Sequence, residues 1–177
     1  YTPATLIADA PEVFDQWRPT NFEAWAYSGH VRLRSALAKS INMVAIKLIQ
    51  DVGPSEVVAY AKRLGIESPL NANPSLALGA SEVTPLEMAE AYSVFASGGL
   101  HHEPWFIEEI RGPGDRVITP DRPEPERIIE AEQAYLIGSM LRTVVREGTA
   151  RDARRLGSDI GGKTGTSNDA HDAWFVG

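Results

Sequence analysis

The chain has 177 residues, of which 43% are hydrophobic and 23% charged, as expected of one soluble globular domain with a buried core. Its formal net charge of -7 argues against nucleic acid or an anionic membrane surface as the main partner, because both select for clustered Lys and Arg. The absence of Cys excludes disulfides, zinc-thiolate sites and thiol catalysis, and no apolar run reaches the roughly 18 to 20 residues of a membrane span.

The N-terminal part of the chain predicts a loop followed by two helices. Residues 1–30 are rich in Pro, Asp and aromatic residues without a regular period, which is typical of an ordered loop with at most short strands. Apolar residues then recur at helical spacing over residues 31–39 and 42–51. The tripeptide Ser40-Ile41-Asn42 lies at the junction of these two predicted helices.

Two further helices are indicated by the residues at their ends. Residues 54–64 have Pro at the start and Gly just after the end, an arrangement typical of a helix. After a loop over residues 66–82, the segment Thr84-Pro85-Leu86-Glu87 resembles a capping box with Pro at the first helical position. This segment predicts a helix that runs to about Ala96.

The following part of the chain predicts a hairpin and a long helix. Residues 104–119 alternate apolar and polar side chains around Gly112-Pro113-Gly114-Asp115, which indicates two short strands joined by a turn. The proline-rich residues 120–126 are expected to form a surface segment. Apolar residues at helical spacing, followed by a glycine, predict a long helix over residues 128–147.

The last predicted elements are two strands, and the first contains a K-T-G motif. Residues 160–166 and 172–176 are expected to pair through a polar turn over residues 167–171. In the motif, Lys163 would tune a nearby hydroxyl, and Thr164 and Thr166 would donate hydrogen bonds. Gly165 would let the backbone of a ligand lie close to the strand. The alternative is an edge strand that happens to contain a lysine.

The second candidate motif is the S-x-N tripeptide Ser40-Ile41-Asn42. The functional interpretation lets Ser40 pass a proton between a neighbouring lysine and a leaving amine, while the amide of Asn42 holds a substrate amide. The alternative is a helix cap, because Ser and Asn are both common at helix N-termini. The usual companion of these two motifs, an S-x-x-K nucleophile, is absent, because no serine of the chain has a lysine three residues later.

Residues 157–164 also match the P-loop pattern G-x-x-x-x-G-K-[ST]. A P-loop must follow a buried strand and open a helix. Residues 150–156 are too charged for a buried strand, and the Gly, Ser, Asn and Asp residues after Thr164 disfavour a helix. Nucleotide binding through a P-loop is therefore a remote alternative.

Two segments rich in His and acidic residues raise the question of a metal site. They are His101-His102-Glu103 and Asp169-Ala170-His171-Asp172. Adjacent ligands on one loop seldom converge on a metal without a third partner at helical or hairpin spacing. We therefore interpret both segments as solvated loops, and expect neither a metal nor a cofactor.

Three separated blocks of sequence, residues 33–46, 76–89 and 162–177, contain these motifs and their flanks. In content and order they resemble the transpeptidase domain of class A, bifunctional penicillin-binding proteins. The resemblance implies an α+β fold, related to serine β-lactamases, in which an antiparallel sheet is flanked by helices. Because both ends of the chain look cut, we expect residues 1–177 to be a partial transpeptidase domain, truncated at both ends and with an incomplete fold.

The resemblance also implies an activity, the cross-linking of peptidoglycan. In that family a serine attacks the D-Ala-D-Ala stem peptide, and β-lactams imitate this donor. By resemblance, Ser40, Asn42 and Lys163 line the cleft, Thr164 and Thr166 contact the donor carboxylate beside Gly165, and the N–H of Thr166 forms half of the oxyanion hole. Without its nucleophile the chain alone is expected to be inactive.

The expected partners are peptidoglycan stem peptides and β-lactams, with no nucleic acid. The expected location is the periplasmic face of the inner bacterial membrane, held there by an N-terminal anchor that this chain lacks. The main alternative keeps the fold without turnover, as a β-lactam-sensing or scaffold domain. If the two motifs share one cleft, the Ser40 hydroxyl and the Lys163 ammonium should lie within about 3 to 4 Å of each other.

Overall fold

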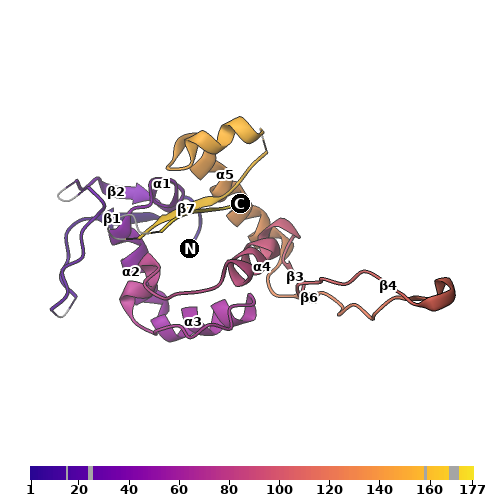
Figure 1. The fold of residues 1–177 in the computed structure, drawn as a ribbon. Helices are drawn as coiled ribbons and strands as arrows, with labels where there is room; N and C mark the ends of the chain where they lie inside the picture. Colours follow the sequence, from indigo (N-terminus) through magenta and orange to yellow (C-terminus); the bar gives the residue numbers. More distant parts are fainter. Residues whose placement is uncertain (15, 24–25, 158, 168–171) are drawn as a thin grey trace.

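The computed structural model describes residues 1–14, 16–23, 26–157, 159–167 and 172–177 (Figure 1). Its α-helices are α1 (Leu33–Lys39), α2 (Asn42–Val52), α3 (Pro54–Arg63), α4 (Pro85–Ala96) and α5 (Ala131–Glu147). Its 3-10 helices are η1 (Pro74–Leu78), η2 (Pro113–Asp115) and η3 (Arg151–Leu156). Its strands are β1 (Leu6–Asp9), β2 (Gly29–Arg32), β3 (Leu100–His101), β4 (Ile110–Arg111), β5 (Val117–Ile118), β6 (Glu126–Arg127), β7 (Lys163–Thr166) and β8 (Ala173–Val176).

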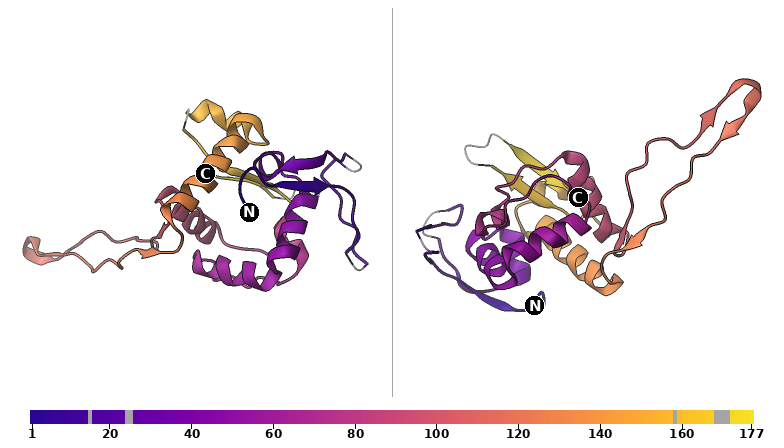
Figure 2. Two further views of the ribbon diagram at one scale, coloured as in Figure 1. Left: turned by 180° about the vertical axis from the view of Figure 1, so that it is seen from behind. Right: turned by 90° about the horizontal axis from the view of Figure 1, so that it is seen from below.

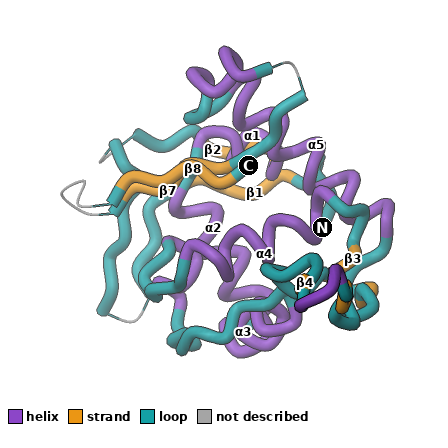
Figure 3. Tube along the Cα trace, turned by 45° about the vertical axis from the view of Figure 1, so that its right-hand side comes forward, coloured by secondary structure: helices purple, strands orange, loops and turns teal. Residues whose placement is uncertain are grey.

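The strands pair two by two in antiparallel ladders. In the part of the chain that the structure describes, β1 pairs with β2, β3 with β6, β4 with β5, and β7 with β8. Figure 3 shows β7 and β8 side by side among the helices, and β7 contacts α5 while β8 contacts α4. This mixture of helices and antiparallel strands confirms the predicted α+β class. Residues 168–171, which belong to the turn expected between β7 and β8, lie outside the described residues.

Helices α1 and α5 pack against each other, and α5 in turn contacts β7. A charged side chain contributes to this packing: Arg34 of α1 donates hydrogen bonds to the Ser139 carbonyl at 2.8 Å and to the Thr143 hydroxyl at 2.9 Å, both on α5. The apolar core around α1 and α2 consists of Leu33, Ala36, Ile41 and Val44. This core holds the junction of α1 and α2, where the S-x-N motif lies.

Most of the predicted helices are confirmed, with shifts at two boundaries. The helix expected from residue 31 begins at Leu33, because Val31 pairs with Ile7 in the β1–β2 ladder. The helix expected from residue 128 begins at Ala131, because the backbone N–H of Ile128 donates to Gly99 and its side chain is buried against α4. The first residues of α1 and α5 are therefore set by tertiary contacts, which the helix propensity of the local sequence does not reveal.

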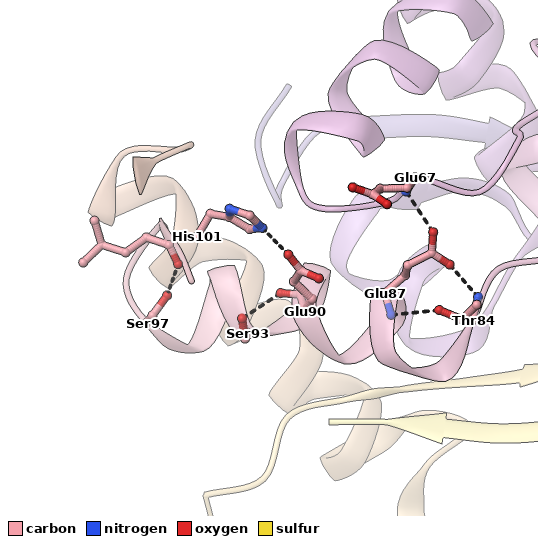
Figure 4. Close-up of polar contacts among 8 residues, drawn as sticks. Glu67, Thr84, Glu87, Glu90, Ser93, Ser97 and His101 are labelled. Carbon is pink, nitrogen blue, oxygen red and sulfur yellow. Dashed lines mark hydrogen bonds and ion pairs between the residues drawn. The ribbon is translucent and has the colours of Figure 1, made fainter. Parts of the chain in front are cut away.

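The predicted capping box at the start of α4 is confirmed, and it has a further role (Figure 4). The Glu87 carboxylate accepts a hydrogen bond from the Thr84 N–H at 2.7 Å, and others from the N–H groups of Glu67 and Ser68 at 2.8 and 2.6 Å. These bonds, first that from Thr84 and then those from Ser68, lower the pKa of Glu87 to about 2. Glu87 therefore ties the loop after α3 to the start of α4.

In its middle, α4 carries a second polar contact, between Glu90 and His101 (Figure 4). The Nε2 of His101 lies 2.6 Å from the Glu90 carboxylate, and both side chains are largely buried. Gly65 adopts φ 99 directly against this carboxylate, and a Cβ there would lie 2.7 Å from the Glu90 Cδ. The glycine predicted to end α3 is thus also required by the packing of Glu90.

Residues 104–127 form a hairpin arm that projects away from the helices (Figures 1 and 2). Strands β4 and β5 pair at its tip around η2, as the Gly112-Pro113-Gly114-Asp115 turn predicts. No residue of the arm is buried, and its exposed apolar side chains include Phe106 and Ile107. Among the described residues, no helix of the chain is long and apolar enough to cross a membrane.

Candidate active site

The backbone of Ser40 turns the chain sharply between α1 and α2. Ser40 has the left-handed conformation, φ 55 and ψ 47, and among described residues other than glycine only Asp115 shares a positive φ. This conformation costs a residue with a Cβ roughly 1 to 2 kcal/mol. Such strain persists where the surrounding structure holds it, frequently at functional sites. Ala36 before this turn and Ile41 after it are both buried in one apolar core.

The left-handed turn brings the Ser40 hydroxyl to Lys163. The Lys163 ammonium donates a hydrogen bond to the Ser40 Oγ at 2.9 Å, although the two residues lie 123 positions apart. The contact expected within 3 to 4 Å is thus confirmed. The helix-cap interpretation of Ser40 is wrong, because α2 begins after Ile41, with no side-chain cap, and Ser40 ends α1 instead.

Lys163 lies at the start of β7, and its side chain is partly buried. A second hydrogen bond, 2.8 Å to the Thr164 carbonyl, fixes the ammonium group in place. Burial lowers the pKa of Lys163, because desolvation disfavours its charged form. A lysine with a lowered pKa, bonded to a hydroxyl, is suited to exchanging a proton with that hydroxyl.

Asn42 is the first residue of α2, two positions beyond Ser40. Its Nδ2 donates a hydrogen bond to the Thr20 carbonyl at 2.9 Å, which ties it to the loop between β1 and β2. Within the described part of the chain, its Oδ1 accepts no hydrogen bond. The amide therefore keeps an acceptor free for another partner.

A partly buried polar network holds the start of α2, and sequence reasoning missed it. The Asn21 Oδ1 accepts from the Met43 N–H at 3.2 Å, and the Asn21 Nδ2 donates to Asp9 at 2.9 Å. Asp9 is only 1% exposed and also accepts from the Ser28 N–H at 2.8 Å. The first N–H groups of a helix lack partners within it, and Asn21 satisfies one of them. The network thereby fixes the backbone beside Asn42.

Thr164 follows Lys163 on β7, and its side chain reaches the segment that follows α5. Its hydroxyl shares a hydrogen bond with the Thr149 hydroxyl, with 2.6 Å between the Oγ1 atoms. Thr149 follows Gly148, which ends α5 as predicted. Sequence reasoning missed Thr149, since nothing in the sequence around it indicates that its hydroxyl meets β7.

Gly165 and Thr166 lie on the exposed part of β7. Among the described residues, a Cβ placed on Gly165 would meet nothing within 4 Å, so packing against them does not require a glycine there. At Gly162, in contrast, a Cβ would lie 2.5 Å from the Phe175 ring. The glycine of the K-T-G motif therefore leaves open space above the strand.

The P-loop alternative is contradicted by the structure. Residues 151–156 form η3, a 3-10 helix, where a P-loop needs a buried strand. Lys163 and Thr164 lie in β7, where a P-loop needs the first turn of a helix. The match to the nucleotide-binding pattern is therefore coincidental.

The two segments considered for a metal differ in what the structure describes. His101 pairs with Glu90, as given above, and the described residues contain no group of three or more His, Cys, Asp or Glu arranged to hold a metal ion. Most of the other segment, residues 169–171, lies outside the described residues.

The sequence model of one protein family, the penicillin binding protein transpeptidase domain, matches residues 7–177. The chain belongs to this family. It is 42% identical over 190 residues to penicillin-binding protein 1A of Neisseria cinerea. The alignment covers 99% of this chain and 24% of that protein. Penicillin-binding protein 1A of Aquifex aeolicus is 42% identical over 167 residues, covering 94% of this chain and 23% of the relative. The family resemblance drawn from the three sequence blocks is thereby confirmed.

Solved structures of the family have the same fold. Penicillin-binding protein 1A of Haemophilus influenzae superposes with a TM-score of 0.88 at 31% identity, over 98% of this chain and 32% of that one. Penicillin-binding protein A of Mycobacterium tuberculosis, an imipenem acyl-enzyme complex, gives a TM-score of 0.83 at 20% identity, over 99% of this chain and 46% of that one. The chain spans about a quarter of the length of the curated relatives it matches, 24% for the Neisseria cinerea protein.

Proposed function

We propose that the full-length protein is a peptidoglycan D,D-transpeptidase that works through a serine acyl-enzyme, and that this chain supplies one side of its active site. The observation that carries the proposal is the 2.9 Å hydrogen bond between Lys163 and Ser40. A helix cap and an unrelated edge strand would give these two groups no reason to meet. Membership of the transpeptidase family supplies the reaction that uses them.

In the proposed reaction, a serine oxygen bonds to the penultimate D-Ala carbonyl carbon, the peptide C–N bond breaks, and the terminal D-Ala leaves as an amine. An amine of a second stem peptide then attacks the ester, which forms the cross-link and frees the serine. The departing D-Ala nitrogen must gain a proton. Ser40 accepts a hydrogen bond from Lys163 and therefore has its own hydroxyl proton to donate.

We assign binding of the donor to Asn42 and to the exposed residues of β7. The free Oδ1 of Asn42 suits the N–H of a substrate amide. The hydroxyls of Thr164 and Thr166 suit the donor carboxylate, and the backbone N–H of Thr166 would form half of the oxyanion hole. The open space above Gly165 supports this assignment, since it lets a substrate lie along the strand.

Stem peptides ending in D-Ala-D-Ala are the proposed substrates, and β-lactams the proposed inhibitors. Support comes from structures with the same fold, described as complexes with imipenem, aztreonam and ampicillin. The substrate places the proposed activity at the periplasmic face of the inner membrane.

The proposal is tested on the full-length protein with a fluorescent penicillin and with donor and acceptor stem peptides. We expect covalent labelling, a mass spectrum that maps the acyl group to a serine followed three residues later by lysine, and transfer to the acceptor. Thr119→Ala on the exposed hairpin arm is the control and should behave as wild type. Acylation of Ser40, or no acylation at all, would refute the proposal, whereas acylation without transfer would indicate a β-lactam sensor.

A further inference from the structure

We infer that Thr149 is a positioning residue, whose hydroxyl orients that of Thr164 toward the carboxylate of the donor or of a β-lactam. The inference rests on the proposed function, because it needs Thr164 to contact that carboxylate. It adds a residue that neither motif contains. The argument comes from the backbone around Thr149, from its hydroxyl, and from its distance to each half of the site.

The Gly148-Thr149 turn is docked on the end of α1. The Thr149 N–H donates a hydrogen bond to the Ala38 carbonyl at 3.0 Å, two residues before Ser40. A Cβ on Gly148 would lie 2.0 Å from that same carbonyl oxygen, so only glycine allows this approach. The backbone of Thr149 is therefore fixed relative to the Ser40 turn.

The side chain of Thr149 then reaches the other half of the site. Its Oγ1 lies 2.6 Å from the Oγ1 of Thr164, next to Lys163 on β7. Thr149 is exposed, so packing does not hold its side chain in this direction. Thr149 therefore connects the end of α1 to β7, through its backbone N–H on one side and a short hydrogen bond shared between two hydroxyls on the other.

The number of available protons decides which of the two hydroxyls, Thr149 or Thr164, donates the shared hydrogen bond when an anion binds. Each hydroxyl carries one proton, and a carboxylate accepts hydrogen bonds but donates none. If Thr164 donates to the carboxylate, it must accept from Thr149. The chain from Thr149 through Thr164 to the carboxylate is then fully satisfied, and each bond polarises the next. Thr149 therefore acts on anionic ligands without contacting them.

The test compares two probes on the full-length protein: benzylpenicillin and its methyl ester, which lacks the negative charge. Thr149→Val removes the hydroxyl and keeps the shape. We expect it to slow acylation by benzylpenicillin about three- to tenfold, as for a lost hydrogen bond, and acylation by the ester less than about twofold. Thr149→Ser should restore the preference for the carboxylate, and Thr119→Val on the hairpin arm should leave both rates unchanged.

A double variant tests whether Thr149 acts through Thr164. On a Thr164→Val background, Thr149→Val should leave the ratio of the two acylation rates unchanged. Equal losses with both probes would show a purely structural role and overturn the inference, as would no loss with either. A further drop in the ratio on that background would also contradict it. Wild-type protein that reacts with neither probe would refute the proposed function, and this inference with it.

Discussion

The tip of the hairpin arm is held by contacts between near neighbours in the chain, whereas the Lys163–Ser40 pair of the candidate active site joins residues that are far apart. Strands β4 and β5 pair across a turn of a few residues, and no side chain of the arm is buried. The Lys163–Ser40 bond spans 123 positions, and the Thr149–Thr164 bond links the end of α5 to β7. Local signals can build the arm, but only the packed core brings the site together. Substitutions should therefore have large effects in the candidate active site and small effects on the arm.

The largest effect is expected at Lys163. In the full-length protein, Lys163→Ala should slow acylation by a fluorescent penicillin by roughly 10²-fold or more, since a charged group that serves the transition state is lost. Lys62→Ala removes an equal charge from an exposed position on α3 and should leave the rate unchanged. A rate for Lys163→Ala within about threefold of wild type would contradict the assignment.

Two substitutions of Ser40 distinguish the role of its hydroxyl from the strain of its backbone. Ser40→Ala and Ser40→Gly both remove the hydroxyl and should slow acylation or transfer by about 10²-fold. Because Ser40 is left-handed, the glycine variant should be more stable than the alanine variant by about 1 kcal/mol. Chemical denaturation measures the difference. Equal stabilities of the two variants would mean that the turn stores no strain.

Glu87 provides a prediction about pH. Its pKa is lowered from 4.5 to about 2, so its hydrogen bonds stabilise the fold fully above the unfolded value and lose this contribution as pH falls through the folded one. Thermal stability of the full-length protein should decline between about pH 4.5 and pH 2, and Glu87→Gln should flatten part of that decline. The exposed Glu82→Gln serves as control, with the wild-type profile expected. An unaltered profile for Glu87→Gln would disprove this role.

The smallest effect is expected on the hairpin arm. Ile110 and Val117 are 48% and 49% exposed, so their replacement by Ser should change the free energy of unfolding by no more than about 0.5 kcal/mol. Acylation of the full-length protein should be unaffected. A large loss of acylation would mean that the arm contributes to the site and would remove the contrast between the two regions.

The same contrast explains which features the sequence could predict. The capping box at Thr84, the hairpin turn and the glycine after α5 are local signals, and all three are confirmed. The meeting of Ser40 and Lys163 followed from the resemblance to the family, which implies that the S-x-N and K-T-G motifs line one cleft. No motif marked Thr149, whose hydroxyl matters only after α5 and β7 have packed.

The same holds for the polar network of Asp9 and Asn21, which depends on how the N-terminal loop folds onto α2. Asp9 follows three apolar residues in an ordinary strand, and its burial cannot be read from that pattern. The predicted start of α1 is wrong for a related reason, because Val31 lies in β2 and pairs with Ile7 of β1. Residues whose partners are distant in sequence are those that local patterns do not reveal.

The most direct test of the central claim is a double-mutant cycle on Ser40 and Lys163 in the full-length protein, measured as the rate of acylation by a penicillin. If the hydroxyl and the ammonium act as one unit, as their 2.9 Å hydrogen bond indicates, the double Ala variant should be little slower than either single variant, by about 10²-fold in all. Losses that multiply to about 10⁴-fold would show independent action and contradict the account.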